Sequence, residues 1–176
     1  KTFRSKGLIS INKTLGDSPN PYPTRLRVKG FPKGKIKKVE VRLYGLTHQR
    51  PNEIQMLLHS PGGRKTLLMR YAGRSNAVTN LNLVLKQNAP KTLPDGNAPG
   101  NLPSGIYKPA AYLALQPFPS PAPQGVNAAN LNVFKNSKAN GFWKLYVHDV
   151  AKNGHYGEIK HGWSLRITAQ VKQKVK

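Results

Sequence analysis

The sequence predicts an all-β fold, a sandwich of two antiparallel sheets made by one domain over residues 1–176, with a core at about 8–169 and short basic tails. Three observations favour this fold class. Apolar and polar residues alternate with a period of two in several segments, as in strands with one buried face. The chain contains 16 Gly and 15 Pro, which disfavour long helices. No segment shows a helical period over about 11 residues.

Three segments show the alternation most clearly. In TRLRVKG (24–30), Leu26 and Val28 alternate with Arg and Lys, and KKVEVRLYG (37–45) and GWSLRIT (162–168) repeat the pattern. The apolar residues are therefore expected in the core and the polar residues in solvent. Because the solvent faces of all three strands carry cations, we expect them to form one continuous basic surface.

A hairpin is expected between residues 53 and 73. EIQMLLHS and KTLLMRYAG flank PGG, whose two glycines indicate a tight turn. This hairpin makes Leu57, Leu58, Leu67 and Leu68 available for burial. A further strand is expected in AVTNLNLVLKQ (77–87), which follows closely in the chain.

Residues 88–130 have a different composition. They are rich in Pro, Gly and Ala, and proline removes backbone donors that a sheet needs. We expect loops that cross the ends or edges of the sheets. A disordered linker is the alternative, but Tyr107, Tyr112 and Phe118 favour loops anchored on the core, because disordered segments contain few aromatic residues.

The stretch from Gly141 to Thr168 predicts a second hairpin, with two short strands joined by a polar turn and a Trp at the start of each strand. Large aromatic side chains contribute much apolar area to a core, so burial is expected, and a ligand-stacking role for the two Trp is the alternative. The residues expected in the core are Trp143, Leu145, Val147, Trp163, Leu165 and Ile167. Those expected near the outer side are Lys144, Lys160 and Arg166.

Charge is the most unusual feature of the chain. It has 29 Lys and Arg against 6 Asp and Glu, for a net charge of +23 and a pI near 10.6. Such a balance implies an anionic partner, which is nucleic acid, acidic polysaccharide, anionic lipid or an acidic protein. A merely soluble surface is the simpler alternative. Lys outnumbers Arg by 20 to 9, which favours diffuse attraction over the planar, forked contacts of Arg.

Other features bear on the cellular compartment. The chain has no Cys, which excludes disulfides and thiolate metal sites and fits a bacterial extracytoplasmic protein. It has no run of 18 apolar residues, so no membrane-spanning segment is expected. It begins with Lys1 rather than Met, as expected of a mature or trimmed form. A periplasmic, cell-surface or secreted location is therefore expected.

Several of these motifs occur together in a known family. They are PYPTRLRVKG, KIKKVEVRLYGLTH, HQRPNEIQMLLHSPGGRKTLLMRYAG, SGIYKPA, FPSPAPQG, LNVFKNSKANGFWKLYVHDVAKNGHYGEI and GWSLRIT. In these segments the chain resembles the P domain of subtilisin-like proprotein convertases (the P or Homo B domain), in a bacterial stand-alone form, over residues 8–169. The combination of NGFWKLYVHD with GWSLRIT is the most specific. The resemblance implies a jelly-roll-like β-sandwich and a noncatalytic role in folding, stability or binding.

The chain departs from this family where the resemblance implies Ca²⁺. At the three places where the family tends to have acidic clusters, this chain has Asn52, Glu53 and Gln55; Lys86 and Gln87; and Asp149 and Val150. Ca²⁺ needs about six to eight oxygen ligands with several carboxylates, so no metal site is expected. We hypothesise that Lys86 replaces the metal electrostatically by pairing with Asp149 or Glu53.

We expect no enzymatic activity and no cofactor. The chain lacks G-x-S-x-G and H-E-x-x-H, and SPGGRKT does not have the spacing of a P-loop. His48, Asp149 and a serine are the residue types of a hydrolase triad, but His48 lies at a strand end and is expected to be a structural hydrogen-bonding residue. His155 and His161 lie in a polar turn and are expected in solvent.

The leading functional hypothesis is an accessory subunit of an extracytoplasmic assembly, which docks an acidic partner through its basic sheet faces. Nucleic-acid binding and attachment to acidic polysaccharide or anionic membrane are the alternatives. Nucleic-acid platforms usually expose several aromatic residues, whereas the aromatics here mostly occupy expected core positions. The predicted contact surface is Arg25, Arg27, Lys33, Lys35, Lys37, Lys38 and Arg42. A solvated edge strand, where Lys prevents edge pairing, is the alternative for residues 33–38.

Overall fold

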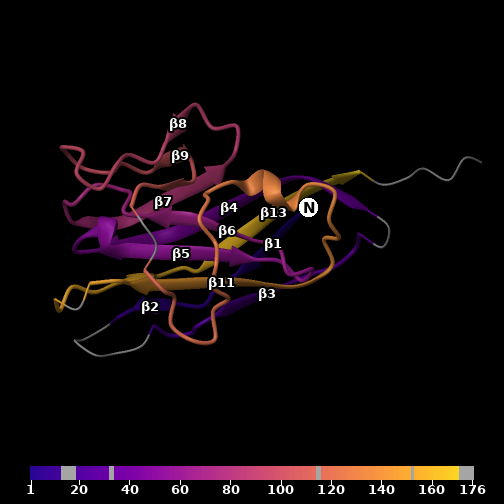
Figure 1. The fold of residues 1–176 in the computed structure, drawn as a ribbon, viewed down its shortest axis with the longest axis horizontal. Coiled ribbons are helices and arrows are strands. Elements are labelled where there is room, and N and C mark those ends of the chain that lie inside the picture. The colour runs from indigo at the N-terminus through magenta and orange to yellow at the C-terminus, as the bar shows by residue number, and fades with distance from the viewer. Residues whose placement is uncertain (13–18, 32–33, 114–115, 152, 171–176) are drawn as a thin grey trace, which may run out of the picture.

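The computed structural model describes residues 1–12, 19–31, 34–113, 116–151 and 153–170. In these residues the strands form two sheets that pack face to face around a shared apolar core, and they run along the long axis of the molecule (Figure 1). The helical elements among them are two short 3-10 turns, η1 (Pro51–Glu53) and η2 (Leu131–Phe134). The predicted all-β sandwich is therefore confirmed.

The eight-stranded sheet has the order β1-β13-β4-β7-β9-β8, and β12 joins β4 to β2. Most of its pairs are antiparallel, but β7 pairs with β9 and β8 with β9 in parallel, so the expectation of purely antiparallel sheets is wrong at this edge. Its strands are β1 (Thr2–Ser5), β2 (Ile9–Ile11), β4 (Lys35–His48), β7 (Val78–Lys86), β8 (Lys91–Thr92), β9 (Gly105–Lys108), β12 (Gly157–Ile159) and β13 (Trp163–Gln170).

The five-stranded sheet has the order β10-β6-β5-β11-β3. Its edge strand β10 also pairs in parallel, with β6. Its strands are β3 (Thr24–Val28), β5 (Ile54–His59), β6 (Lys65–Arg70), β10 (Ala110–Ala111) and β11 (Gly141–Asp149).

The three strongly alternating segments form strands as predicted. Leu26 and Val28 of β3 are buried, and so are the apolar residues of β4 and β13, while most polar residues between them reach solvent. Ser164 is an exception because β1 pairs beside it and the Tyr44 hydroxyl lies 2.9 Å from its Oγ. Alternation therefore predicts which face of each strand meets the core.

The predicted hairpin of β5 and β6 is also confirmed, and both of its faces are buried. Leu58 and Leu68 belong to the core between the sheets. Leu57 and Leu67 lie on the opposite face, in a second apolar cluster with Phe118. The proline-rich chain around Phe118 therefore covers part of the outer face of the five-stranded sheet.

The segment from residue 88 to 130 is anchored on the core, but not only as loops at sheet ends and edges. It contributes the short strands β8, β9 and β10, and it covers the sheet face described above. Tyr107 and Phe118 are buried as anchors. Tyr112 is 41% exposed, and only its hydroxyl is anchored, by donating to the Leu93 carbonyl at 2.6 Å.

The predicted hairpin between Gly141 and Thr168 is wrong. Its first strand, β11, pairs with β3 and β5 in the five-stranded sheet, whereas β13 pairs with β1 and β4 in the other sheet. The core assignment of its six apolar residues is nevertheless confirmed, since each is at most 1% exposed. The connection between the strands therefore crosses from one sheet to the other, and β12 pairs with β4 on the way.

A buried hydrogen bond connects the sheets at the second tryptophan. Trp163 Nε1 on β13 donates to Thr24 Oγ1 on β3 at 3.1 Å. Trp143 Nε1 on β11 donates to the Ala139 carbonyl at 2.9 Å. Both indole N–H groups are thus satisfied in the core, as buried polar groups require.

We predict that Thr24→Val destabilises the protein although it preserves volume. The change leaves the Trp163 N–H buried without an acceptor, which costs about 1–3 kcal/mol. Urea unfolding at pH 7 measures the loss. The control is Thr168→Val at an exposed position of β13, where a change within about 0.5 kcal/mol is expected. Equal stability of the two variants would contradict the role of this bond.

Candidate functional site

The outer face of the eight-stranded sheet gathers cations from four neighbouring strands. Strand register places Arg166 and Lys86 on either side of Glu40, and it places Arg4 and Arg42 on either side of Ser164. Between these two cross-strand rows lies a third, made of Leu165, Val41 and Leu85, which is buried. Because side chains alternate along a strand, the charged residues of the two flanking rows point away from the core. We call this surface the β4 face. It comprises Arg4, Lys38, Arg42, Lys86 and Arg166 with Glu40.

The single carboxylate of the β4 face is already paired. Arg42 Nη2 lies 2.6 Å from Glu40 Oε1, and Arg42 Nε donates to the same oxygen at 2.8 Å. The Arg4 guanidinium stacks 4.0 Å from the Tyr44 ring centroid. Among the described residues, the other four cations of the face have no ion pair. The β4 face therefore presents an excess of positive charge.

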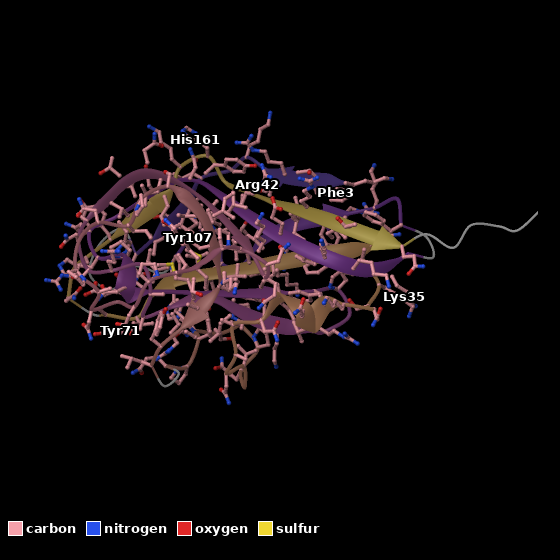
Figure 2. All side chains as sticks on the ribbon, turned by 90° about the horizontal axis from the view of Figure 1, so that it is seen from above. Phe3, Lys35, Arg42, Tyr71, Tyr107 and His161 are labelled. Carbon is pink, nitrogen blue, oxygen red and sulfur yellow. The ribbon has the colours of Figure 1, made fainter. Side chains whose placement is uncertain are left out.

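The predicted basic surface is not continuous, and this expectation is corrected. Lys35, Lys37, Lys38 and Arg42 all lie on β4, with Arg42 midway along the molecule and Lys35 at one end (Figure 2). Arg25 and Arg27 lie on β3 in the other sheet, so they face the opposite side of the sandwich. Lys33 lies outside the described residues.

A second basic surface lies on the outer side of the five-stranded sheet. One cross-strand row contains Lys65, His59, Lys144 and Arg25, each directly opposite the next. Two residues further along β3 and β11, Arg27 lies opposite the exposed Phe142, with its guanidinium 5.7 Å from the ring centroid. We call this surface the β11 face. It comprises Arg25, Arg27, Lys65 and Lys144 with His59 and Phe142.

The β11 face carries like charges side by side. Partial burial, and then Lys144 and Lys65, lower the pKa of His59 and favour its neutral form. No carboxylate occupies the row from Lys65 to Arg25. Like charges directly opposite one another destabilise a sheet, so this row lowers stability unless an anion neutralises it.

The rest of this sheet's outer face is closed by the proline-rich segment. Arg70, 5% exposed, donates through Nε to the Leu113 carbonyl at 2.8 Å and through Nη1 to Gln55 Oε1. His148 lies between Tyr22 and Phe118, and burial lowers its pKa to about 4. These polar groups are enclosed, so they do not extend the basic surface.

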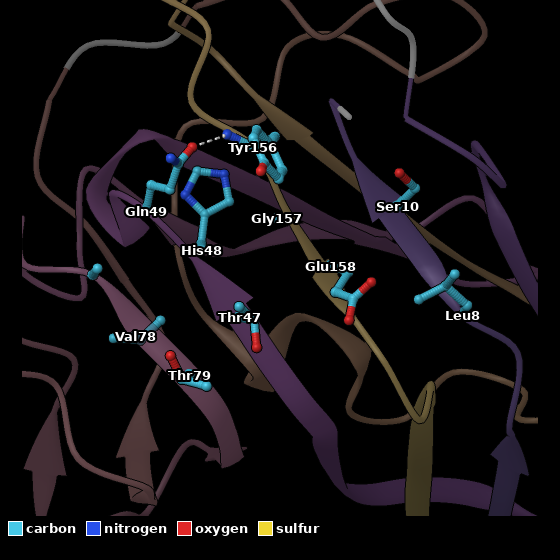
Figure 3. Close-up of a pocket in the computed structure, with 11 residues that line it drawn as sticks. Leu8, Ser10, Thr47, His48, Gln49, Val78, Thr79, Tyr156, Gly157 and Glu158 are labelled. Atoms are coloured by element: carbon cyan, nitrogen blue, oxygen red, sulfur yellow. Dashed lines mark hydrogen bonds between the residues drawn. The ribbon is translucent and has the colours of Figure 1, made fainter. Parts of the chain in front are cut away.

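A hollow of about 390 Å³ lies at the end of β4, bordered by β2, β7 and β12 (Figure 3). His48 lines it, but a backbone amide occupies its Nδ1, and its Nε2 faces Asp149 without a hydrogen bond. Nδ1 accepts from the Arg50 amide at 3.1 Å, and Nε2 lies 3.3 Å from Asp149 Oδ2. A general base needs a nitrogen directed at its nucleophile, so His48 and Asp149 do not form a hydrolase triad here. The predicted structural role of His48 agrees with this geometry.

The family-like acidic positions do not fit Ca²⁺. Glu53 accepts from Asn153 Nδ2 at 2.8 Å and lies 2.8 Å from His155 Nδ1. Asp149 accepts from the Ala151 amide at 2.7 Å through its other oxygen. Glu53 is thus held by two protein groups, and Asp149 Oδ2 has no hydrogen-bond partner in the part of the chain that the structure describes. The described residues contain no cluster of three or more Asp, Glu, His or Cys, whereas Ca²⁺ needs several carboxylates together.

Two sequence expectations are corrected at these positions. Lys86 pairs with neither Glu53 nor Asp149 among the described residues. It lies on β7 opposite Glu40, and histidines occupy the expected place beside each acid. His155 is half-buried and contacts Glu53, whereas His161 is exposed as expected.

Comparisons with known proteins give no family assignment. No model of a protein family matches the chain, and no curated protein matches it. Among solved structures, it is similar to the Aeromonas sobria serine protease and chaperone complex (15% identity, TM-score 0.46, 98% of this chain and 26% of that chain). It is also similar to the A. sobria serine protease alone (16%, 0.43, 95% and 26%). The chain thus spans about a quarter of the length of these solved chains.

The described residues include no helix with the length and hydropathy of a membrane span.

We predict that Lys144→Gln stabilises the protein at low salt. Removing the central ammonium relieves repulsion with Arg25 and Lys65 and is expected to add about 0.2–1 kcal/mol to the free energy of unfolding. The gain should shrink near 0.5 M salt because exposed charges are screened. Thermal unfolding at two salt concentrations measures both effects, with exposed Lys160→Gln as the charge-matched control. Equal gains in the two variants would contradict repulsion within the row.

We predict that stability decreases as the pH falls from about 6.5 to 4, because of His148. Its folded pKa of about 4 lies below the unfolded value, so in this window the unfolded chain binds a proton that the folded chain does not. The contribution is complete above about pH 6.5 and totals about 3 kcal/mol. An NMR titration of the imidazole measures the folded pKa, and His148→Gln should flatten the slope. A pKa near 6.5 would contradict the burial effect.

Proposed function

We propose that the chain is a noncatalytic P-domain-like binding module, folded as one domain, that docks an acidic protein partner through the β4 face. The observation that carries the proposal is the charge of that face. Five cations occupy neighbouring positions on four strands, and the one carboxylate among them is held by Arg42. The family resemblance and the Cys-free sequence support an extracytoplasmic location as part of this proposal.

An apolar strip beside these cations favours a protein partner. Register places half-buried Val84 beside Arg42, and Ile106, 44% exposed, beside Val84. Protein interfaces combine an apolar centre with a polar rim, whereas phosphate contacts need only charge. The β4 face thus offers both elements of a protein interface on a preformed sheet.

Nucleic-acid binding is the second candidate, and the β11 face is the observation that favours it. Phe142 is 52% exposed, and it lies beside Arg27 and close to Lys144. Stacking on an aromatic ring with flanking cations is how single strands are bound. One exposed aromatic is fewer than such platforms use, which places this candidate second.

We predict that Arg4→Gln with Arg166→Gln weakens binding of poly-L-glutamate about tenfold at 0.15 M salt, because each exposed charge contact contributes about 0.2–1 kcal/mol. The control is Arg25→Gln with Arg27→Gln on the opposite face, which removes the same two charges from the +23 total. Calorimetry with both variants measures the difference.

Equal weakening in the two pairs would show that net charge alone drives binding, and the proposed site would fail. Oligo-dT gives the corresponding test of the alternative. Nucleic-acid binding through the β11 face predicts that only the Arg25 and Arg27 variant loses oligo-dT affinity.

A further inference from the structure

A cleft of about 420 Å³ lies where the β4 face meets η2. One wall is the paired ends of β4 and β7, and the other is the turn that contains Leu131. Three lysines line it, Lys38, Lys86 and Lys135, together with Asn88 and Asn132. This volume is within the range of small-molecule sites, about 300–1,000 Å³.

The two walls are held in place by hydrogen bonds. The Leu131 amide donates to Gln87 Oε1 at 2.8 Å, which ties η2 to the end of β7. Arg64 Nη1 donates to the carbonyls of Val133 at 2.7 Å and Lys135 at 2.8 Å, which ties the turn to the β5–β6 hairpin. The cleft is therefore formed before any ligand arrives, which reduces the entropy cost of binding.

The charge of the cleft is not balanced from within. Glu40 also lines it, but its carboxylate is occupied by Arg42. Among the described residues, the three lysines form no ion pair, and the side-chain amides of Asn88 and Asn132 form no hydrogen bond. Ammonium and amide N–H groups are the donors that bind oxyanions.

We propose that this cleft is a specific site for an oxyanion group, carboxylate or phosphate, with Lys38, Lys86 and Lys135 as its cationic ligands. The inference deepens the proposed function, since Lys38 and Lys86 also belong to the β4 face. An acidic side chain of the docked partner is one source of the group, and free phosphate is the other. In both cases three ammonium groups bind one anion in a preformed hollow.

The test is an NMR titration at about 0.15 M NaCl, which screens diffuse attraction beyond about 8 Å. The probes are inorganic phosphate and acetyl-triglutamate amide. We expect saturable shifts at Lys86 and Lys135 in the wild type and at least tenfold weaker binding in Lys86→Gln with Lys135→Gln. The matched control, Lys91→Gln with Lys160→Gln, removes two exposed lysines that do not line the cleft and should stay within twofold.

Equal weakening in both variants would overturn the proposal, because it would show attraction by net charge only. Tighter binding of triglutamate than of phosphate identifies a partner side chain as the ligand source, and the reverse order identifies phosphate. Lys86→Arg with Lys135→Arg should retain binding, which separates loss of charge from loss of folding. Arg4 and Arg166 do not line the cleft, so their poly-L-glutamate test fails or succeeds independently of this one.

Discussion

The face-to-face packing of the two sheets is the constraint on which the rest of the structure depends. Without disulfides, stability rests on burying one side of each strand against the opposite sheet, including both tryptophans. Cations cannot be buried there without partners, so β3, β4, β11 and β13 must direct them outward. The proline-rich segment then covers part of one outer face and leaves two separate basic surfaces.

The β11 face works against stability, because Lys144 lies directly opposite Arg25 with no acid in the row. The β4 face has five cations and one acid, which among the described residues forms an ion pair with Arg42. Solubility does not require such arrangements, because interspersed charges of both signs provide it. We propose that an anionic partner relieves this repulsion when it docks, which would explain why the chain keeps its basic faces.

The sequence predicts which face of a strand is buried better than it predicts which strands pair with each other. The alternation of apolar and polar residues indicates which side chains of a strand are buried, and it correctly predicts the burial of Leu26, Val41 and Trp163. It does not state which strands share a sheet, because that depends on contacts between segments far apart in the chain. Proximity along the chain therefore predicts a hairpin of β11 and β13, which does not form.

The same limitation affected the candidate site. The predicted contact surface combines Arg25 and Arg27 with residues of β4 although they lie on the opposite side, and it does not include Arg4 and Lys86. Arg4 belongs to a four-residue strand too short for a clear period, so only its pairing with Ser164 reveals its place. The cleft that we propose for an oxyanion needs η2 beside the end of β7, a contact with no sequence signature.

The central claim is that the β4 face docks an acidic protein. The most direct measurement is photo-crosslinking in the cells that make the protein, from p-benzoylphenylalanine placed at Thr168 near Lys38 or at Phe142 on the opposite face. The account predicts a nuclease-resistant adduct with an acidic protein from position 168 and none from position 142. An adduct that forms only from position 142, or one that nuclease removes, would contradict it.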